Sequence, residues 1–114
     1  MESVYHTVYS RDLSRRGLFV ESKKPISFDY DGLWFEDAFV PDLIVERCIV
    51  IEVKSSPQIL PIHYMQLLTY LRLMDLRLGY VVNFGVPSFK GAVRRVVNEM
   101  YGSFSGTGHG REGA

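Results

Sequence analysis

The strongest constraint on the fold is the stretch 41–55, in which two apolar arms flank one polar pair. Apolar and β-branched residues fill both arms, and Glu46 and Arg47 lie between them. Short apolar runs separated by a polar turn are typical of paired strands whose side chains are buried. The stretch therefore predicts two strands joined by a tight turn.

Three charged residues interrupt these arms: Asp42, Glu52 and Lys54. Alternate side chains of a strand point to the same face, so Glu52 and Lys54 share a face. On a strand that looks buried, a carboxylate and an ammonium are costly unless they pair with each other or bind a ligand. An ion pair at the end of the strand is the preferred interpretation of an isolated Glu-x-Lys tripeptide.

The number of residues in the turn decides whether a third charge joins them. With a three-residue loop at 46–48, Val45 lies opposite Ile49, and Asp42 then lies opposite Glu52 on the same face. A two-residue loop shifts the register and moves Asp42 to the other face. The odd-numbered loop therefore predicts two carboxylates side by side.

Two adjacent carboxylates repel each other, and a hard divalent cation such as Mg2+ relieves that repulsion. The cation would polarise a phosphate and acidify a bound water, while Lys54 would orient that water or offset developing charge. Asp42, Glu52 and Lys54 thus predict a site for phosphodiester hydrolysis.

The same residues resemble a known signature. Pro41-Asp42, nine intervening residues and then Glu52-Val53-Lys54 resemble the PD-(D/E)XK motif of the restriction-endonuclease-like nucleases. Together with that motif, the ordered set that resembles the GxxExxY family of that superfamily is Glu2-x-x-Tyr5, His63-x-x-Gln66-x-x-x-Tyr70 and Val82-Asn83-Phe84-Gly85. The resemblance runs from Glu2 to about Val97, and the family's leading glycine has no counterpart because the chain begins at Met1.

The resemblance implies an α/β, restriction-endonuclease-like domain with a central mixed β-sheet flanked by helices. It also implies a nuclease that uses Mg2+ or Mn2+ on nucleic acid, with DNA favoured over RNA. The metal ligands that it suggests are Asp42, Glu52, the Val53 carbonyl and, from the first helix, Glu2. The catalytic residues that it suggests are Asp42, Glu52, Lys54, Gln66 and Tyr70, the last two as substrate-positioning groups.

Size and composition limit the number of domains and indicate the cellular compartment. A chain of 114 residues with 46% hydrophobic content suits one compact domain, expected at 1–101, and the Gly-rich tail 102–114 is expected to be disordered. A single cysteine, Cys48, fits a reducing cytoplasm, and no apolar run is long enough to cross a membrane.

The balance of 13 basic and 13 acidic residues argues against an indiscriminate nucleic-acid binder. Two basic groups could still form a phosphate track, although solvated surface is the commoner explanation. They are Arg11, Arg15, Arg16, Lys23 and Lys24, and then Lys90, Arg94 and Arg95. An oligomer whose paired surfaces widen that track is compatible with the balanced charge.

The remaining elements follow from periodicity and turn residues. We expect a first helix at 2–16 ended by Gly17, strands at 18–21, 26–30 and 33–40, a helix at 61–78 closed by Gly79, and strands at 80–84 and 89–100. Glu36 and Asp37 are expected to be solvated surface, and His63 to have a capping or structural role.

Two other functions remain open at this point. One is a non-catalytic adaptor on a nuclease-like fold that binds nucleic acid or protein, which the balanced charge favours and the intact Asp42, Glu52 and Lys54 disfavour. The other is an interaction module whose apolar helix at 61–78 docks a partner.

Overall fold

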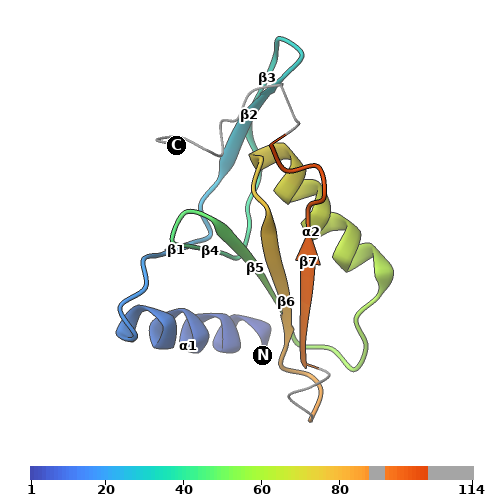
Figure 1. Ribbon diagram of the computed structural model, residues 1–114. Helices are drawn as coiled ribbons and strands as arrows, with labels where there is room; N and C mark the ends of the chain where they lie inside the picture. Colours follow the sequence, from blue (N-terminus) through green and yellow to red (C-terminus); the bar gives the residue numbers. More distant parts are fainter. Residues whose placement is uncertain (88–91, 103–114) are drawn as a thin grey trace.

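The computed structural model describes residues 1–87 and 92–102. Its elements, in chain order, are α1 (Glu2–Arg15), β1 (Val20–Ser22), β2 (Ile26–Tyr30), β3 (Leu33–Phe39), β4 (Leu43–Val45), β5 (Ile49–Lys54), α2 (Pro61–Met74), β6 (Leu78–Asn83) and β7 (Val93–Val97). Figure 1 shows the sheet strands at the centre, with the two helices apart from each other.

Five strands form the central sheet in the order β1-β4-β5-β6-β7. Neighbouring strands are antiparallel except β5 and β6, which are parallel and are connected through α2. A parallel pair needs such a crossover, because a tight turn can only reverse the chain. The expected α/β fold with a mixed sheet and flanking helices is confirmed.

The turn between β4 and β5 has the predicted odd length. Val45 pairs with Ile49, and Leu43 pairs with Ile51. Glu46 and Arg47 accommodate the turn with positive φ angles of 54° and 60°. Continuing this register by one residue brings Asp42 opposite Glu52, as the three-residue loop predicts.

The two faces of the hairpin pack against different helices. On one face, Ile44 and Val50 belong to the core that contains Leu67 and Leu71 of α2. Residues of the opposite face, among them Val53, form a second core. That second core comprises Leu43, Val45, Ile51, Val53 and Val82, against which Tyr5, Tyr9 and Leu13 of α1 pack. The sheet is therefore a middle layer between α1 and α2.

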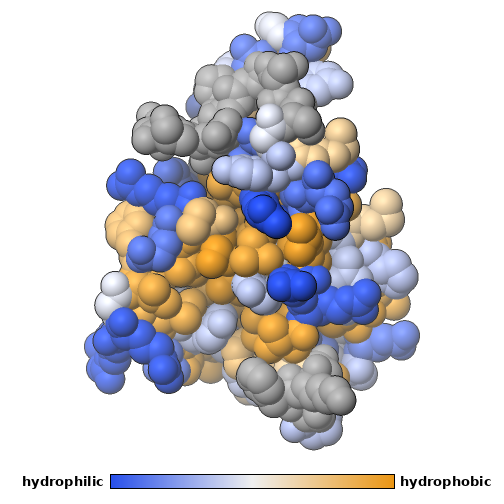
Figure 2. Space-filling view, viewed as in Figure 1, coloured by the Kyte–Doolittle hydropathy of each residue, from blue (hydrophilic) through white to orange (hydrophobic). Residues whose placement is uncertain are grey.

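Strands β2 and β3 do not join the central sheet but form a two-stranded sheet of their own. Figure 1 shows this hairpin projecting away from the body of the molecule. Glu36 and Asp37 are exposed on β3, as expected for solvated surface. Figure 2 shows that apolar side chains remain visible across the middle of the same view, where the central sheet lies.

The end of α2 differs from the sequence-based expectation. The helix stops at Met74, and Asp75 takes the left-handed conformation with φ 53°, a position that glycine usually occupies. Gly79 instead lies in β6, where an added Cβ would come within 3.0 Å of both the Val50 oxygen and Leu67 Cδ1. This glycine therefore serves close packing, and β6 begins earlier than the expected 80–84.

The other differences are small. Strand β1 begins two residues later than expected, because its pairing partners in β4 start at Val45 opposite Val20. The expected strand at 89–100 is present as β7, although 88–91 and the tail 103–114 lie outside the described residues. In the part of the chain that the structure describes, no helix is long and apolar enough to cross a membrane.

Candidate active site

The centre of the candidate site is a reciprocal pair of hydrogen bonds between Asp42 and the β5 strand. The Asp42 N–H donates to Glu52 Oε2 at 2.9 Å, and the Val53 N–H donates to Asp42 Oδ2 at 2.8 Å. Both acidic residues are buried, with 8% of Asp42 and 5% of Glu52 exposed. The backbone of each strand therefore holds the carboxylate of the other, which fixes the two acids side by side.

This arrangement changes the acidity of Glu52. Burial and, second, the neighbouring charge of Asp42 raise its pKa from 4.5 to about 7. The hydrogen bond from the Asp42 backbone and the charges of Lys54 and Lys23 oppose the shift without cancelling it. A buried carboxyl beside another carboxylate retains its proton to higher pH because its charged form is poorly solvated and repelled.

Lys54 does not pair with Glu52 in the way that a structural ion pair requires. Among residues 1–87 and 92–102, the ion pairs join Lys23 to Asp42 and Lys24 to Glu21. Lys54 is half-buried at the end of β5, and its charge lowers the pKa of Glu52. The Glu52–Lys54 ion pair that a lone tripeptide would suggest is therefore absent from the described structure, and the Lys54 ammonium is not committed to a carboxylate.

The cation that pairs with Asp42 is Lys23, which the sequence analysis did not assign to the site. Its Nζ lies 2.5 Å from Asp42 Oδ1, and its backbone N–H donates to the Asp42 carbonyl oxygen at 3.0 Å. The pairing of Ser22 with Leu43 in neighbouring strands brings Lys23 beside Asp42. The sequence placed Lys23 in a surface basic group, because nothing in it showed that β1 pairs with β4.

The segment after Lys54 is anchored by Asn83, which explains the Val82-Asn83-Phe84-Gly85 motif. Asn83 Oδ1 accepts from the N–H groups of Ser56 and Gly85 at 3.1 and 2.9 Å, and its Nδ2 donates to the Ser56 oxygen at 2.9 Å. An added Cβ at Gly85 would lie 2.4 Å from the Ser56 nitrogen. The motif is thus structural: it holds the turn that follows Lys54.

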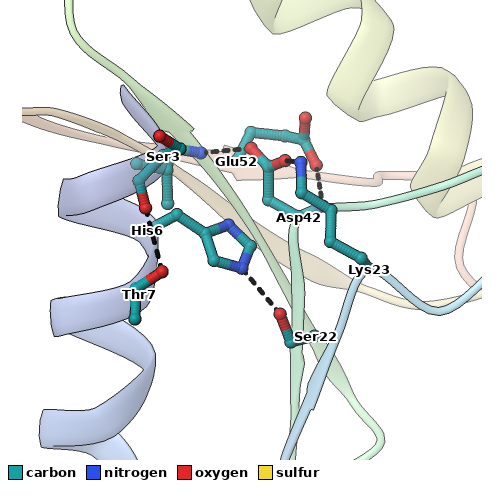
Figure 3. A network of polar contacts seen from close by, with 8 residues as sticks. Ser3, His6, Thr7, Ser22, Lys23, Asp42 and Glu52 are labelled. Atoms are coloured by element: carbon teal, nitrogen blue, oxygen red, sulfur yellow. Dashed lines mark hydrogen bonds and ion pairs between the residues drawn. The ribbon is translucent and has the colours of Figure 1, made fainter. Parts of the chain in front are cut away.

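A pocket of about 360 Å3 opens beside Asp42. Its lining residues come from α1, from the end of β1 and from the acidic hairpin, which we define as β4, β5 and the adjoining Asp42. They are Glu2, Ser3, His6, Thr7, Ser22, Lys23, Asp42 and Val53, and Figure 3 shows most of them around the carboxylates.

His6 is a pocket residue that sequence reasoning missed. It is buried, its Nε2 lies 2.6 Å from Ser22 Oγ, and its Nδ1 has no hydrogen-bond partner among the described residues. A signal was present, because His6 follows Glu2 by four positions and so lies one helical turn away on the same stripe.

The residues fit a hard divalent cation. No group of three His, Cys, Asp or Glu side chains gathers in the described residues, so Glu2 lines the pocket without joining the two buried acids in a cluster. Mg2+ requires only one or two carboxylates, because it keeps several waters. The Lys23 ammonium contacts Asp42 Oδ1 and stands in for a metal ion there, which indicates that this oxygen favours a positive charge.

The three polar residues expected on one stripe of α2 separate into different roles. His63 Nδ1 accepts a hydrogen bond from the Leu60 N–H at 3.1 Å, so His63 caps the helix as expected. Gln66 is exposed. Tyr70 stacks on Phe39 with ring centroids 4.4 Å apart, and its pKa is raised by burial and then by the charges of Glu52 and Asp42. Of these three α2 residues, Tyr70 is therefore the one whose hydroxyl is affected by the charges of Glu52 and Asp42.

Tyr70→Phe is expected to leave the free energy of unfolding nearly unchanged while weakening substrate binding or turnover. The ring keeps its stacking on Phe39, and the hydroxyl makes no hydrogen bond among the described residues. A buried hydroxyl with a partner would instead contribute about 1 kcal/mol of stability. Urea unfolding and a cleavage assay on this variant, with Tyr64→Phe as the control on the same helix, separate the two roles.

Comparisons with known proteins identify the family and the fold. The family model of the PD-(D/E)XK nuclease superfamily matches residues 1–96. A solved structure titled "Crystal structure of SSO0001" has a TM-score of 0.63 and 24% identity over 84% of this chain, and the match covers 50% of that chain. The chain thus spans about half the length of that structure, and the likeness shows the fold alone. No curated protein matches the sequence. Because the family model matches most of its length, the chain belongs to the PD-(D/E)XK nuclease superfamily.

Proposed function

We propose that the protein hydrolyses phosphodiester bonds of nucleic acid with the help of Mg2+ or Mn2+. The observation that carries the proposal is the reciprocal hydrogen bonding that holds Asp42 and Glu52 side by side at the end of the acidic hairpin. Maintaining two buried acids together is unfavourable for a purely structural purpose, because the charge of Asp42 raises the cost of ionising the buried Glu52. A divalent cation is the ligand that makes this arrangement favourable.

In this proposal, Asp42, Glu52 and the Val53 carbonyl hold the cation, and Glu2 lies at the pocket wall near them. When bound, the cation would neutralise charge on the phosphate and acidify a water. Asp42 stays oriented by the Val53 N–H, which leaves its Oδ1 for the cation site.

The other residues act on the substrate. Lys54, on the same face of β5 as Glu52 and free of a carboxylate partner in the described structure, stabilises negative charge that develops on the phosphate. Tyr70 and the exposed Gln66 position the nucleic acid along α2. The ordered motifs support membership of the GxxExxY group, and DNA is the substrate proposed ahead of RNA.

The direct test is a cleavage assay on the purified wild-type protein. Labelled single- and double-stranded DNA and RNA are incubated with Mg2+ or Mn2+, and the expected result is metal-dependent cleavage, faster on DNA, that a chelator abolishes. The Lys54→Met variant, purified in the same way, controls for contaminating nucleases. Divalent binding without cleavage of any of the four substrates would instead favour the non-catalytic adaptor.

A further inference from the structure

We propose that Lys23 is an internal counter-ion that occupies the cation position on Asp42 in the metal-free protein, and that a divalent metal must displace it. This inference rests on the proposed function, since it assumes that Asp42 ligates the metal. It assigns Lys23 a role that neither its sequence context nor the superfamily signature indicates.

The first support is the geometry at Asp42. One carboxylate oxygen, Oδ2, is held by the Val53 N–H, and the other, Oδ1, contacts the Lys23 ammonium. The carboxylate oxygen that the backbone does not hold is therefore already occupied by a positive charge (Figure 3). A metal and the ammonium compete for the same oxygen, because both cannot lie within contact distance of it without repelling each other.

The second support is the way Lys23 is held. Its backbone adopts a positive φ of 53°, which a lysine rarely takes, and its N–H donates to the Asp42 carbonyl oxygen. This contact fixes the Cα of Lys23 beside Asp42. Its side chain is 59% exposed, whereas that of Asp42 is 12% exposed. The backbone is anchored and the side chain lies in solvent, so the ammonium can leave without unfolding its neighbours.

The third support is the local charge. Glu2 and Asp42 line the same pocket as Lys23, and Glu52 accepts a hydrogen bond from the Asp42 N–H. The ammonium therefore lies beside the acids of the proposed metal site. In the metal-free protein it offsets part of their mutual repulsion.

Displacement by the metal would free the Lys23 ammonium to contact a phosphate of the substrate. Lys23 lines the pocket beside Asp42, so its released ammonium would remain close to a phosphate bound there. An ammonium that leaves a carboxylate for a phosphate exchanges one charged hydrogen bond for another. Lys23 is therefore a positioning residue for the substrate as well as a competitor of the metal.

The test measures Mn2+ binding by calorimetry at one ionic strength for wild type, Lys23→Met, Lys23→Arg and Lys24→Met. Lys23→Met is expected to tighten the Kd for Mn2+ on the order of tenfold, because the competing cation is gone. Lys23→Arg keeps the cation and is expected to stay near wild type, and it covers the case in which the methionine variant does not fold. Lys24→Met is the matched control, since Lys24 pairs with Glu21 outside the pocket.

Substrate kinetics supply the second readout. At saturating metal, Lys23→Met is expected to raise KM for the oligonucleotide severalfold while changing kcat less, because a phosphate contact is lost. A purely structural Lys23–Asp42 ion pair predicts no gain in Mn2+ affinity and no selective effect on KM.

The outcomes separate this inference from the proposed function. Wild-type binding of Mn2+ that Lys23→Met leaves equal or weaker overturns the role of Lys23 and leaves the nuclease proposal intact. Mn2+ binding by Lys23→Met and not by wild type supports strongly the competition between Mn2+ and the Lys23 ammonium. Binding by neither protein overturns both proposals, since no cation then reaches Asp42.

Discussion

Lys54→Met is expected to bind divalent metal at least as tightly as wild type while its turnover falls by about two to three orders of magnitude. The proposed ligands Asp42 and Glu52 remain in place, and one positive charge near them is removed. The Lys54 charge acts on Glu52, where it lowers the pKa of that carboxyl. Removing it therefore leaves the proposed metal site more attractive to a cation but takes away the group proposed to stabilise the transition state.

The measurement pairs metal binding by calorimetry with single-turnover cleavage. Lys24→Met, which removes a lysine from the surface of the same domain, is expected to retain wild-type values in both. A Lys54→Met protein that cleaves at the wild-type rate would remove Lys54 from the chemistry. A protein that loses metal binding instead would show that Lys54 organises the site rather than acting on the substrate.

The hairpin shows how much of such a site can be read from the sequence. The position of Glu46 and Arg47 in the middle of an apolar stretch predicts a tight turn and leaves a two-residue and a three-residue loop open. The structure has the three-residue loop, and the period of a strand then places Asp42 opposite Glu52. These are local constraints, carried by residues within one turn of each other. Periodicity and turn residues indicate the order of helices and strands, whereas the mixed α/β fold is what the resemblance to the restriction-endonuclease-like nucleases implies.

The residues that sequence reasoning missed depend on contacts between distant segments. Lys23 reaches Asp42 only because β1 pairs with β4, and His6 enters the pocket only because α1 packs on that side of the sheet. The pairing of β1 with β4 leaves no periodic signal in the sequence, and the four-residue spacing of Glu2 and His6 places both on one stripe of α1 without showing which side of the sheet α1 covers. The end of α2 was misplaced for a different reason: Asp75 adopts the left-handed cap, so Gly79 was free to serve the contact with Val50.

Glu52→Gln is expected to stabilise the metal-free protein at pH 8 by up to roughly 3 kcal/mol, and to abolish divalent binding. The folded pKa of Glu52, about 7, lies above the ordinary value of 4.5, so the folded chain holds this proton more tightly than the unfolded chain. The stability that this proton contributes is fully present below pH 4.5 and is lost as the pH rises through 7. The glutamine side chain cannot ionise, and its oxygen can still accept the Asp42 N–H.

The difference in unfolding free energy between variant and wild type should therefore be near zero at pH 4.5, grow up to pH 7 and stay constant above it. Urea unfolding in a chelator at several pH values measures this difference, and Glu36→Gln, on the exposed face of β3, is the matched control.

Added Mg2+ should stabilise wild type at pH 8 but not Glu52→Gln, because the cation binds only the folded carboxylate pair. A structural ion pair predicts the opposite sign, since removing one partner of a buried pair destabilises by about 3 to 5 kcal/mol. Strong destabilisation by Glu52→Gln, together with no effect of Mg2+ on wild type, would therefore make Glu52 part of the scaffold and end the case for a metal-dependent nuclease.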